Sequence, residues 1–301
     1  MSKSLMRSRF VITILITTIT GLPSAQTAQK PPNEQPEMES HIGKLTGHAH
    51  DAKMTYRRYC VGCHGERGDG TGENAPYIDP KPRDFTAGAF KCRSTPTGTL
   101  PTDSDLYKSI GRGFNTSNMP SWITLSNQER ADLVAYVKTF SPKFHDEKPG
   151  APIVIPAETP VTIESISHGS ELFQKMECWK CHGQQGRGDG PSASTLTDSK
   201  DLPIRPYDFS SGSRFKCGQT NADLYQIFMT GLDGTPMPSF SDNIKPNDAW
   251  DLVHFLRTLQ TKRKSRENEV LKAAGGHIPT KAPEGQEPPK PEQNKAPGGG
   301  N

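Results

Sequence analysis

Two strings of the form Cys-x-x-Cys-His constrain this 301-residue chain more than any other feature. The first covers residues 60–64 and the second covers residues 178–182, so the second follows the first by 118 positions. Other strings recur at the same offset, namely Asp-Leu-Tyr at 105–107 and 223–225 and Met-Pro-Ser at 119–121 and 237–239. Recurrence at one fixed offset indicates a duplicated unit. The chain is therefore predicted to fold as two similar halves.

The spacing within each string has a chemical meaning. Thiols three positions apart lie one helical turn apart, where both can add to the vinyl groups of one porphyrin, and this spacing marks c-type haem attachment. A single string is also compatible with a redox dithiol or half of a zinc site, but two strings at equivalent repeat positions favour haem. We predict two covalently attached haems c. The residues predicted to attach them and to supply the proximal imidazole are Cys60, Cys63 and His64 in the first half and Cys178, Cys181 and His182 in the second.

Each half also offers a second axial ligand for the haem iron. Met119 follows His64 by 55 positions, and Met237 follows His182 by the same number. Each methionine precedes a proline, which cannot continue a helix, so each methionine is expected on a loop of defined conformation. A thioether is a soft donor that suits haem iron, and Met/His ligation raises the reduction potential. We predict that these methionines complete the two coordination shells.

The motifs together resemble a known family. Each half resembles a class I cytochrome c domain, over about 46–140 and 165–260, and the whole resembles the tandem di-haem cytochromes c of bacteria. The resemblance rests on the haem strings, the glycines after them, the Met-Pro loops and the terminal helices. It implies a helical fold around each haem, with an exposed haem edge that passes electrons. The Pro-Arg-Asp-Phe-Thr string at 82–86 resembles a subgroup associated with respiratory oxidoreductases.

Hydrophobic spacing predicts an all-α fold, because no alternating strand pattern is visible. Helices are expected over 49–60 and 167–178, each leading into a haem string. The last helix of the first half begins at Ser126, where Glu129 three residues later completes a capping box. Its counterpart is expected over about 247–259. The glycine-rich runs after the haem strings are expected to let the backbone approach the porphyrin.

The remaining segments are polar and rich in proline or glycine. Hydrophobic residues make up only 32 % of the chain, too few for one large core, which favours small domains around an apolar cofactor. The predicted organisation is a signal peptide at 1–25 with cleavage near Ala25 or Ala28, a disordered segment at 26–45, a first cytochrome c domain at 46–141, a Pro-rich linker at 142–164, a second domain at 165–261 and a disordered tail at 262–301.

The N-terminus indicates the compartment. Three basic residues precede a short apolar run over 10–22, a pattern typical of a secretory signal peptide. A run of about 13 residues is short for a membrane span, which needs roughly 17–25. The protein is thus expected in the periplasm, with membrane attachment only if this segment is retained. Loss of Lys3, Arg7 and Arg9 would bring the formal charge from +3 to zero, so nucleic acid is not an expected partner.

Two further cysteines, Cys92 and Cys217, follow matching Phe-Lys pairs in the two halves. Three interpretations stay open. They form a disulfide between the halves, which an oxidising compartment permits, or they are free buried thiols, or one is a thiolate ligand to a haem.

Three histidines outside the haem strings have less specific interpretations. His50 and His168 match between the halves, but they lie too close to the haem helix to reach the iron and are expected to cap or pack. His254 aligns with Ala135 and is expected on a helix surface.

The leading functional hypothesis is a periplasmic di-haem electron carrier, free or as the cytochrome subunit of a respiratory oxidoreductase, that performs no bond chemistry. Its expected partner is a redox protein, an oxidoreductase or oxidase. Two alternatives are a thiosulfate-oxidising type of haem enzyme with a Cys-ligated haem and a membrane-anchored di-haem subunit of a terminal oxidase.

Overall fold

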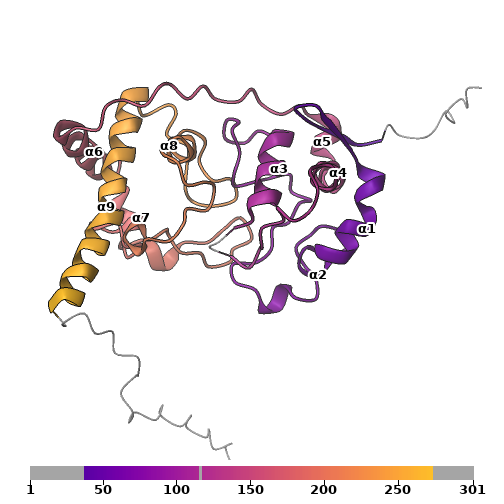
Figure 1. Cartoon of the computed structure of the whole chain (residues 1–301), viewed down its shortest axis with the longest axis horizontal. Coiled ribbons are helices and arrows are strands. Elements are labelled where there is room, and N and C mark those ends of the chain that lie inside the picture. The colour runs from indigo at the N-terminus through magenta and orange to yellow at the C-terminus, as the bar shows by residue number, and fades with distance from the viewer. Residues whose placement is uncertain (1–36, 115–116, 274–301) are drawn as a thin grey trace, which may run out of the picture. The chain divides into compact units, whose positions relative to one another are not determined.

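The structure is a computed structural model that describes residues 37–114 and 117–273, with side chains described up to residue 260 (Figure 1). The predicted signal peptide and the predicted disorder at 26–36 and 274–301 lie outside the described residues. In chain order the elements are β1 (Glu39–Ile42), β2 (Leu45–His48), α1 (Ala49–Tyr59), α2 (Val61–His64), η1 (Ala75–Tyr77), α3 (Asp103–Arg112), α4 (Asn127–Lys138), α5 (Lys143–Asp146), α6 (Ile163–Lys175), α7 (Trp179–His182), η2 (Ala193–Thr195), η3 (Phe209–Ser211), α8 (Asn221–Thr230) and α9 (Pro246–Ala273).

The described residues are mainly helical, but the first half begins with an antiparallel hairpin of β1 and β2. The prediction of disorder was therefore wrong for residues 39–45. The predicted all-α fold also did not include this small sheet. The hairpin is held against α4: the Ser40 hydroxyl donates to the Ala131 carbonyl at 2.7 Å, and the His48 amide donates to Asp132 at 3.0 Å. A Cβ at Gly47 would lie 2.2 Å from the Ala131 carbonyl carbon, so only glycine permits this approach. Tertiary packing offsets the ordering cost of a short polar segment.

Helix α4 closes the first half as the sequence predicts. The capping box at its start is present, with the Glu129 amide donating to the Ser126 hydroxyl at 3.1 Å and the Ser126 amide donating to Glu129 at 2.9 Å. The helix packs against α1, and together they bury the core of this half. The buried apolar residues of this core are Ala52, Tyr56, Phe85, Phe90, Leu106, Leu133, Val134 and Val137.

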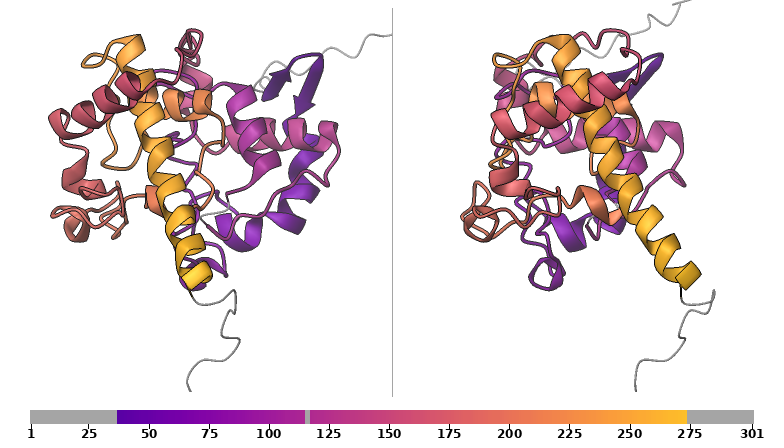
Figure 2. Two further views of the ribbon diagram at one scale, coloured as in Figure 1. Left: turned by 60° about the vertical axis from the view of Figure 1, so that its left-hand side comes forward. Right: turned by 90° about the vertical axis from the view of Figure 1, so that its left-hand side faces the viewer.

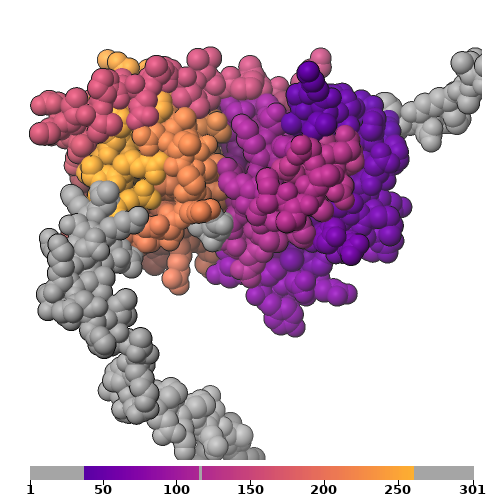
Figure 3. All heavy atoms as spheres, viewed as in Figure 1, coloured from indigo at the N-terminus to yellow at the C-terminus, as the bar shows by residue number. Residues whose placement is uncertain are grey.

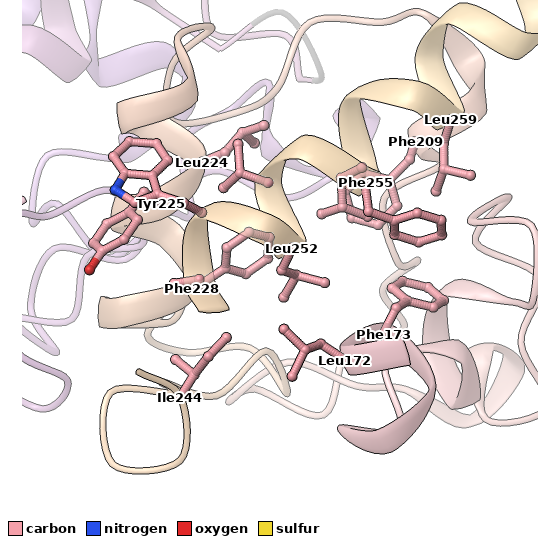
Figure 4. Close-up of a cluster of buried hydrophobic side chains, with 14 of the residues drawn as sticks. Leu172, Phe173, Phe209, Leu224, Tyr225, Phe228, Ile244, Leu252, Phe255 and Leu259 are labelled. Atoms are coloured by element: carbon pink, nitrogen blue, oxygen red, sulfur yellow. The ribbon is translucent and has the colours of Figure 1, made fainter. Parts of the chain in front are cut away.

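In the second half, α6 lies across α9, as both views of Figure 2 show. The crossing is close at Gly169, where a Cβ would lie 2.0 Å from the Asp251 carbonyl oxygen. Figure 4 shows the core beside this crossing, with Phe173 of α6 and Phe255 of α9 facing each other; their ring centroids are 5.5 Å apart. Leu224 and Phe228 bring α8 into the same cluster. The two halves therefore repeat one plan, in which the terminal helix packs on the helix that leads into the haem string.

Helix α9 continues to Ala273, so the prediction of disorder was wrong for residues 262–273. That prediction relied on the polar composition of the segment. The segment is rich in lysine, arginine and glutamate, which favour helix when a packed helix already precedes them.

The segment between the halves is held to both of them. The Ile153 amide donates to the Ser94 carbonyl at 2.8 Å, and Ile155 packs against the core of the second half. The Glu158 carboxylate lies 3.2 Å from His254 Nε2. The expectation of a surface position for His254 was wrong, because the residue is only 2 % exposed and its Nδ1 lies 3.1 Å from the Ser165 hydroxyl. Its counterpart Ala135 is also fully buried, so the matching position is an interior one in both halves.

On the face drawn in Figure 3, the residues of each half occupy a separate area of the surface. Among the described residues, no helix combines the length and apolar character that a bilayer span requires.

Candidate cofactor sites

Each Cys-x-x-Cys-His string forms a short helical turn. In the first half, α2 follows α1 directly, and the His64 amide donates to the Cys60 carbonyl at 2.9 Å. In the second half, the His182 amide donates to the Cys178 carbonyl at the same distance. Both thiols and the imidazole of each string are thereby brought onto one turn, the arrangement that attachment of one porphyrin requires.

The first thiol of each string is partly shielded from water. Burial raises the pKa of Cys60 to about 12 and that of Cys178 to about 11. A redox dithiol or a zinc site relies on cysteine thiolates with a lowered pKa. Cys60 and Cys178 thus differ from redox dithiols in the direction of the pKa shift.

The orientation of His64 is fixed by the backbone. Its Nδ1 donates to the Arg83 carbonyl at 3.0 Å, because a carbonyl oxygen can only accept. This bond leaves Nε2 without a proton and free to bind a metal, as in many metal-ligating histidines. The Phe85 ring stacks on the imidazole with centroids 4.4 Å apart, and desolvation by burial lowers the pKa of His64. Burial therefore favours the neutral form of this imidazole.

The second half repeats this arrangement. His182 Nδ1 donates to the Tyr207 carbonyl at 2.9 Å, and the Phe209 ring lies 4.7 Å from the imidazole. Burial again lowers the pKa of this histidine. The two carbonyls and the two rings belong to similar strings, Arg-Asp-Phe at 83–85 and Tyr-Asp-Phe at 207–209, whose role the sequence did not indicate. The structure shows that their carbonyls and phenyl rings orient the two histidines.

Two of the glycines after the haem strings lie against the backbone of the string that precedes them. A Cβ at Gly72 would lie 2.4 Å from the Gly62 carbonyl oxygen, and one at Gly190 would lie 2.3 Å from the Lys180 carbonyl oxygen. These glycines therefore allow the following loop to pack on the backbone of the haem string itself.

The two predicted methionine ligands lie on equivalent loops. Each loop follows a glycine with positive φ, Gly113 after α3 and Gly231 after α8. The Phe114 amide donates to the Met119 carbonyl at 2.9 Å, and the Leu232 amide donates to the Met237 carbonyl at 3.0 Å. Both methionine side chains are half-buried.

A serine ties each methionine loop back to the helix before it. The Ser121 hydroxyl donates to the Gly111 carbonyl, and the Ser239 hydroxyl donates to the Met229 carbonyl, both at 2.7 Å. The sequence-identical Met-Pro-Ser strings therefore fold in the same way, with the serine as the anchor.

The structure joins Cys92 and Cys217 in a disulfide across 125 residues of chain. Both cysteines are buried. Neither the free-thiol nor the thiolate-ligand interpretation describes this structure.

Charged contacts between the halves surround the disulfide. The Arg93 guanidinium pairs with Asp233 at 2.8 Å and donates to the Thr230 carbonyl, while the Gln226 amide donates back to the Arg93 carbonyl at 2.9 Å. The Arg112 guanidinium donates to the Cys217 carbonyl. The disulfide is thus one part of a larger contact between the halves.

The two matching histidines outside the strings bind carboxylates. His168 Nδ1 lies 2.8 Å from Asp251, and His50 pairs with Glu37. Each of these histidines therefore has a carboxylate partner in its own half.

Two family models match the chain. Residues 166–260 match the family described as Cytochrome c, and residues 47–137 match the family described as Cytochrome C oxidase, cbb3-type, subunit III. Among solved structures, the chain is similar to a chain of the Kuenenia stuttgartiensis reducing HAO-like protein complex. The two are 43 % identical, with a TM-score of 0.68, over 69 % of this chain and 95 % of that chain. No curated protein matches the chain.

Proposed function

Because the chain belongs to the cytochrome c family, as a tandem cytochrome with two covalently attached haems, we propose that it carries single electrons between redox proteins of the periplasm. The observation that carries this proposal is the duplicated histidine setting. In both halves a backbone carbonyl fixes the tautomer and a phenylalanine ring covers the imidazole. Two histidines that are held in the same way fit an electron carrier with two similar haem sites.

We propose which residues would hold the haems. Thioether bonds would form at Cys60 and Cys63 in the first half and at Cys178 and Cys181 in the second. His64 and His182 would supply the proximal nitrogens, and Met119 and Met237 the thioether sulfurs opposite them. When bound, each haem supplies an iron that cycles between the ferrous and ferric states.

The surrounding residues would favour electron transfer over bond chemistry. A methionine on an anchored loop would fill the last iron position, so substrates would be kept from the metal. Desolvation by burial lowers the pKa of His64 and that of His182, which favours the neutral imidazoles. We therefore propose a carrier and not an enzyme. A thiosulfate-oxidising type of enzyme is disfavoured, because both cysteines that could ligate a haem are used in the disulfide.

The partner is proposed to be a respiratory oxidoreductase or oxidase. The similar solved chain comes from a reducing HAO-like protein complex, which supports a place beside a redox enzyme. A second candidate function is a di-haem subunit of a terminal oxidase, and the match of residues 47–137 to the cbb3-type subunit III family favours it.

A redox titration followed by visible spectroscopy tests the proposal. The protein, purified from the periplasmic fraction, should take up two electrons per chain and develop sharp c-type bands. The oxidised form should show a weak Met–iron charge-transfer band, and added carbon monoxide should leave the reduced spectrum unchanged. Rapid carbon monoxide binding to both haems would contradict a closed electron carrier. Recovery only with membranes would favour the oxidase-subunit candidate.

A further inference from the structure

Side chains of the kinds that bind metal ions gather where α6 crosses α9. His168 and Glu171 lie three positions apart on α6, and Asp248 and Asp251 lie three positions apart on α9. Residues at this spacing are neighbours on one face of a helix. The ligand atoms of His168, Asp248 and Asp251 all lie within 4.8 Å of one another, and the charge of Glu171 also acts on His168. These four residues are called the crossing cluster below.

The backbone that carries the crossing cluster is fixed by the contact between the two helices. Gly169 directly follows His168, and a Cβ at this glycine would lie 2.0 Å from the Asp251 carbonyl oxygen. The same Asp251 places its carboxylate 2.8 Å from His168 Nδ1. Ligands carried by packed helices are held more precisely than ligands on loops. The crossing therefore brings one nitrogen donor and several oxygen donors together at fixed places.

The carboxylates of the crossing cluster lack cations of the chain to balance them. Within the part of the chain that the structure describes, Asp248 and Glu171 have no hydrogen bond or ion pair. The Asp251 carboxylate, whose side chain is 17 % exposed, has His168 as its partner and no lysine or arginine. Carboxylates gathered around one imidazole repel each other, and a bound cation would turn this repulsion into attraction.

The first half has residues of the same kinds at the matching positions, but they make other contacts. The matching residues are His50, Glu129 and Asp132. Glu129 belongs to the capping box at the start of α4, and the Asp132 carboxylate accepts the His48 amide at 3.0 Å. His50 pairs with Glu37 of its own half. The donors of the first half are therefore used within the protein, whereas those of the crossing cluster face one another.

We propose that His168, Asp248 and Asp251 bind one zinc-like divalent transition-metal ion, and that Glu171 joins them as a further ligand. One imidazole nitrogen together with carboxylate oxygens is a donor set that zinc accepts, whereas Mg²⁺ takes oxygen ligands. In the metal-free protein His168 Nδ1 shares a proton with Asp251, and the ion would take the place of that proton. This site requires no haem and is independent of the proposed function.

The ion would link the two helices that position the second haem string. Helix α6 ends shortly before that string, and α9 is the helix on which α6 packs. An ion that binds the folded chain and not the unfolded chain stabilises the folded state. Zinc should therefore raise the midpoint of urea denaturation of the protein, and Mg²⁺ at the same concentration should leave the midpoint unchanged.

The experiment is a calorimetric titration of the full-length holoprotein with zinc chloride after removal of bound metal by a chelator, together with urea denaturation with and without zinc. Wild-type protein should bind zinc saturably, and Asp248→Asn and His168→Gln should each weaken this binding at least about tenfold, since even outer-shell partners of a metal ligand contribute that much. Both variants should also lose the shift in the urea midpoint. No saturable zinc binding by the wild type, or wild-type affinity in Asp248→Asn, would overturn the proposal.

His50→Gln is the matched control, because it removes the corresponding histidine of the first half, which also lies beside carboxylates. It should keep the zinc affinity and the midpoint shift of the wild type. A zinc response that is lost in His50→Gln and kept in Asp248→Asn would place the ion near the N-terminal hairpin and overturn the proposal. If His168→Gln does not accumulate as folded protein, Asp248→Asn carries the same test, because Asp248 has no hydrogen bond to lose within the described residues. The haem content of each protein reports separately on the proposed function.

Discussion

At the scale of single residues, the two halves orient the histidine of the haem string in the same way, although one of the residues involved differs. The carbonyl that orients the histidine belongs to an arginine in one half and to a tyrosine in the other, which is possible because only the backbone is used. The phenylalanine two positions later is the same in both halves, because its ring packs on the imidazole. A substitution at Phe85 should therefore disturb the setting of His64 more than a substitution at Arg83, which keeps the backbone carbonyl.

The methionine assignments lead to a prediction for each loop. Met119→Ala should remove the Met–iron charge-transfer contribution of one haem and lower the potential of that haem alone, because the thioether ligand is lost. Met237→Ala should do the same for the other haem. Met229→Ala is the control, since Met229 packs against the core of the second half. Oxidised near-infrared spectra and redox titrations measure the effect, and an unchanged band in Met119→Ala would refute that assignment.

At the scale of elements, the helix crossings position the haem strings. Helix α6 leads into the second string, and its place depends on the contact between Gly169 and the Asp251 backbone of α9. Gly169→Ala should lower the free energy of unfolding by about 1–3 kcal/mol, the usual cost of overpacking. Ser167→Ala, on an exposed position of the same helix, should have little effect. Urea denaturation of the holoproteins makes the comparison, and equal stabilities would contradict the close crossing.

The same crossing carries a pH-dependent contact. Hydrogen bonding to Asp251 raises the pKa of His168 above its ordinary value of 6.5. A histidine with a raised folded pKa contributes stability that is full below the unfolded pKa and is lost as the pH rises through the folded pKa. His168→Gln should therefore destabilise the protein more at about pH 5.5 than at about pH 9. Denaturation at both pH values tests this, and a larger loss at the higher pH would contradict the assigned direction.

Elements with strong patterns could be predicted from the sequence. The Ser126–Glu129 box and the apolar stripe after it are local signals, and α4 begins where they place it. The hairpin at 39–48 could not be predicted in this way, because its strands have four residues each and are ordered by contacts with α4, far away in sequence. The burial of His254 also depends on a distant residue, Glu158 of the linker.

At the scale of the whole molecule, a disulfide and charged side chains join the two halves. The repeat predicts two similar halves, and the haem strings predict their chemistry, because both signals are local in the chain. No local sequence pattern predicts the pairs that form across the contact, such as Arg93 with Asp233 and Arg112 with the Cys217 carbonyl. For the two spare cysteines, the sequence left three interpretations open, and only the fold selects the disulfide.

The disulfide should act on stability and not on the iron. Cys92→Ser should lower the free energy of unfolding by about 2–5 kcal/mol and leave the haem spectrum unchanged. The double variant with Cys217→Ser should match the single one, because both remove the same cross-link. Unfolded, unreduced wild-type protein should show no reactive thiol, since the other four cysteines are expected to be bound to haem. A changed low-spin spectrum in Cys92→Ser would instead indicate a thiolate ligand.

The central claim is that each half of the chain holds one covalently attached haem, and intact-mass spectrometry of the denatured protein tests it most directly. Denaturation removes any haem that is held only by packing and leaves thioether-linked haem in place. The account predicts a mass equal to the processed chain plus two haems, falling by one haem when both cysteines of either string are changed to serine. A wild-type mass with one haem or none would contradict it.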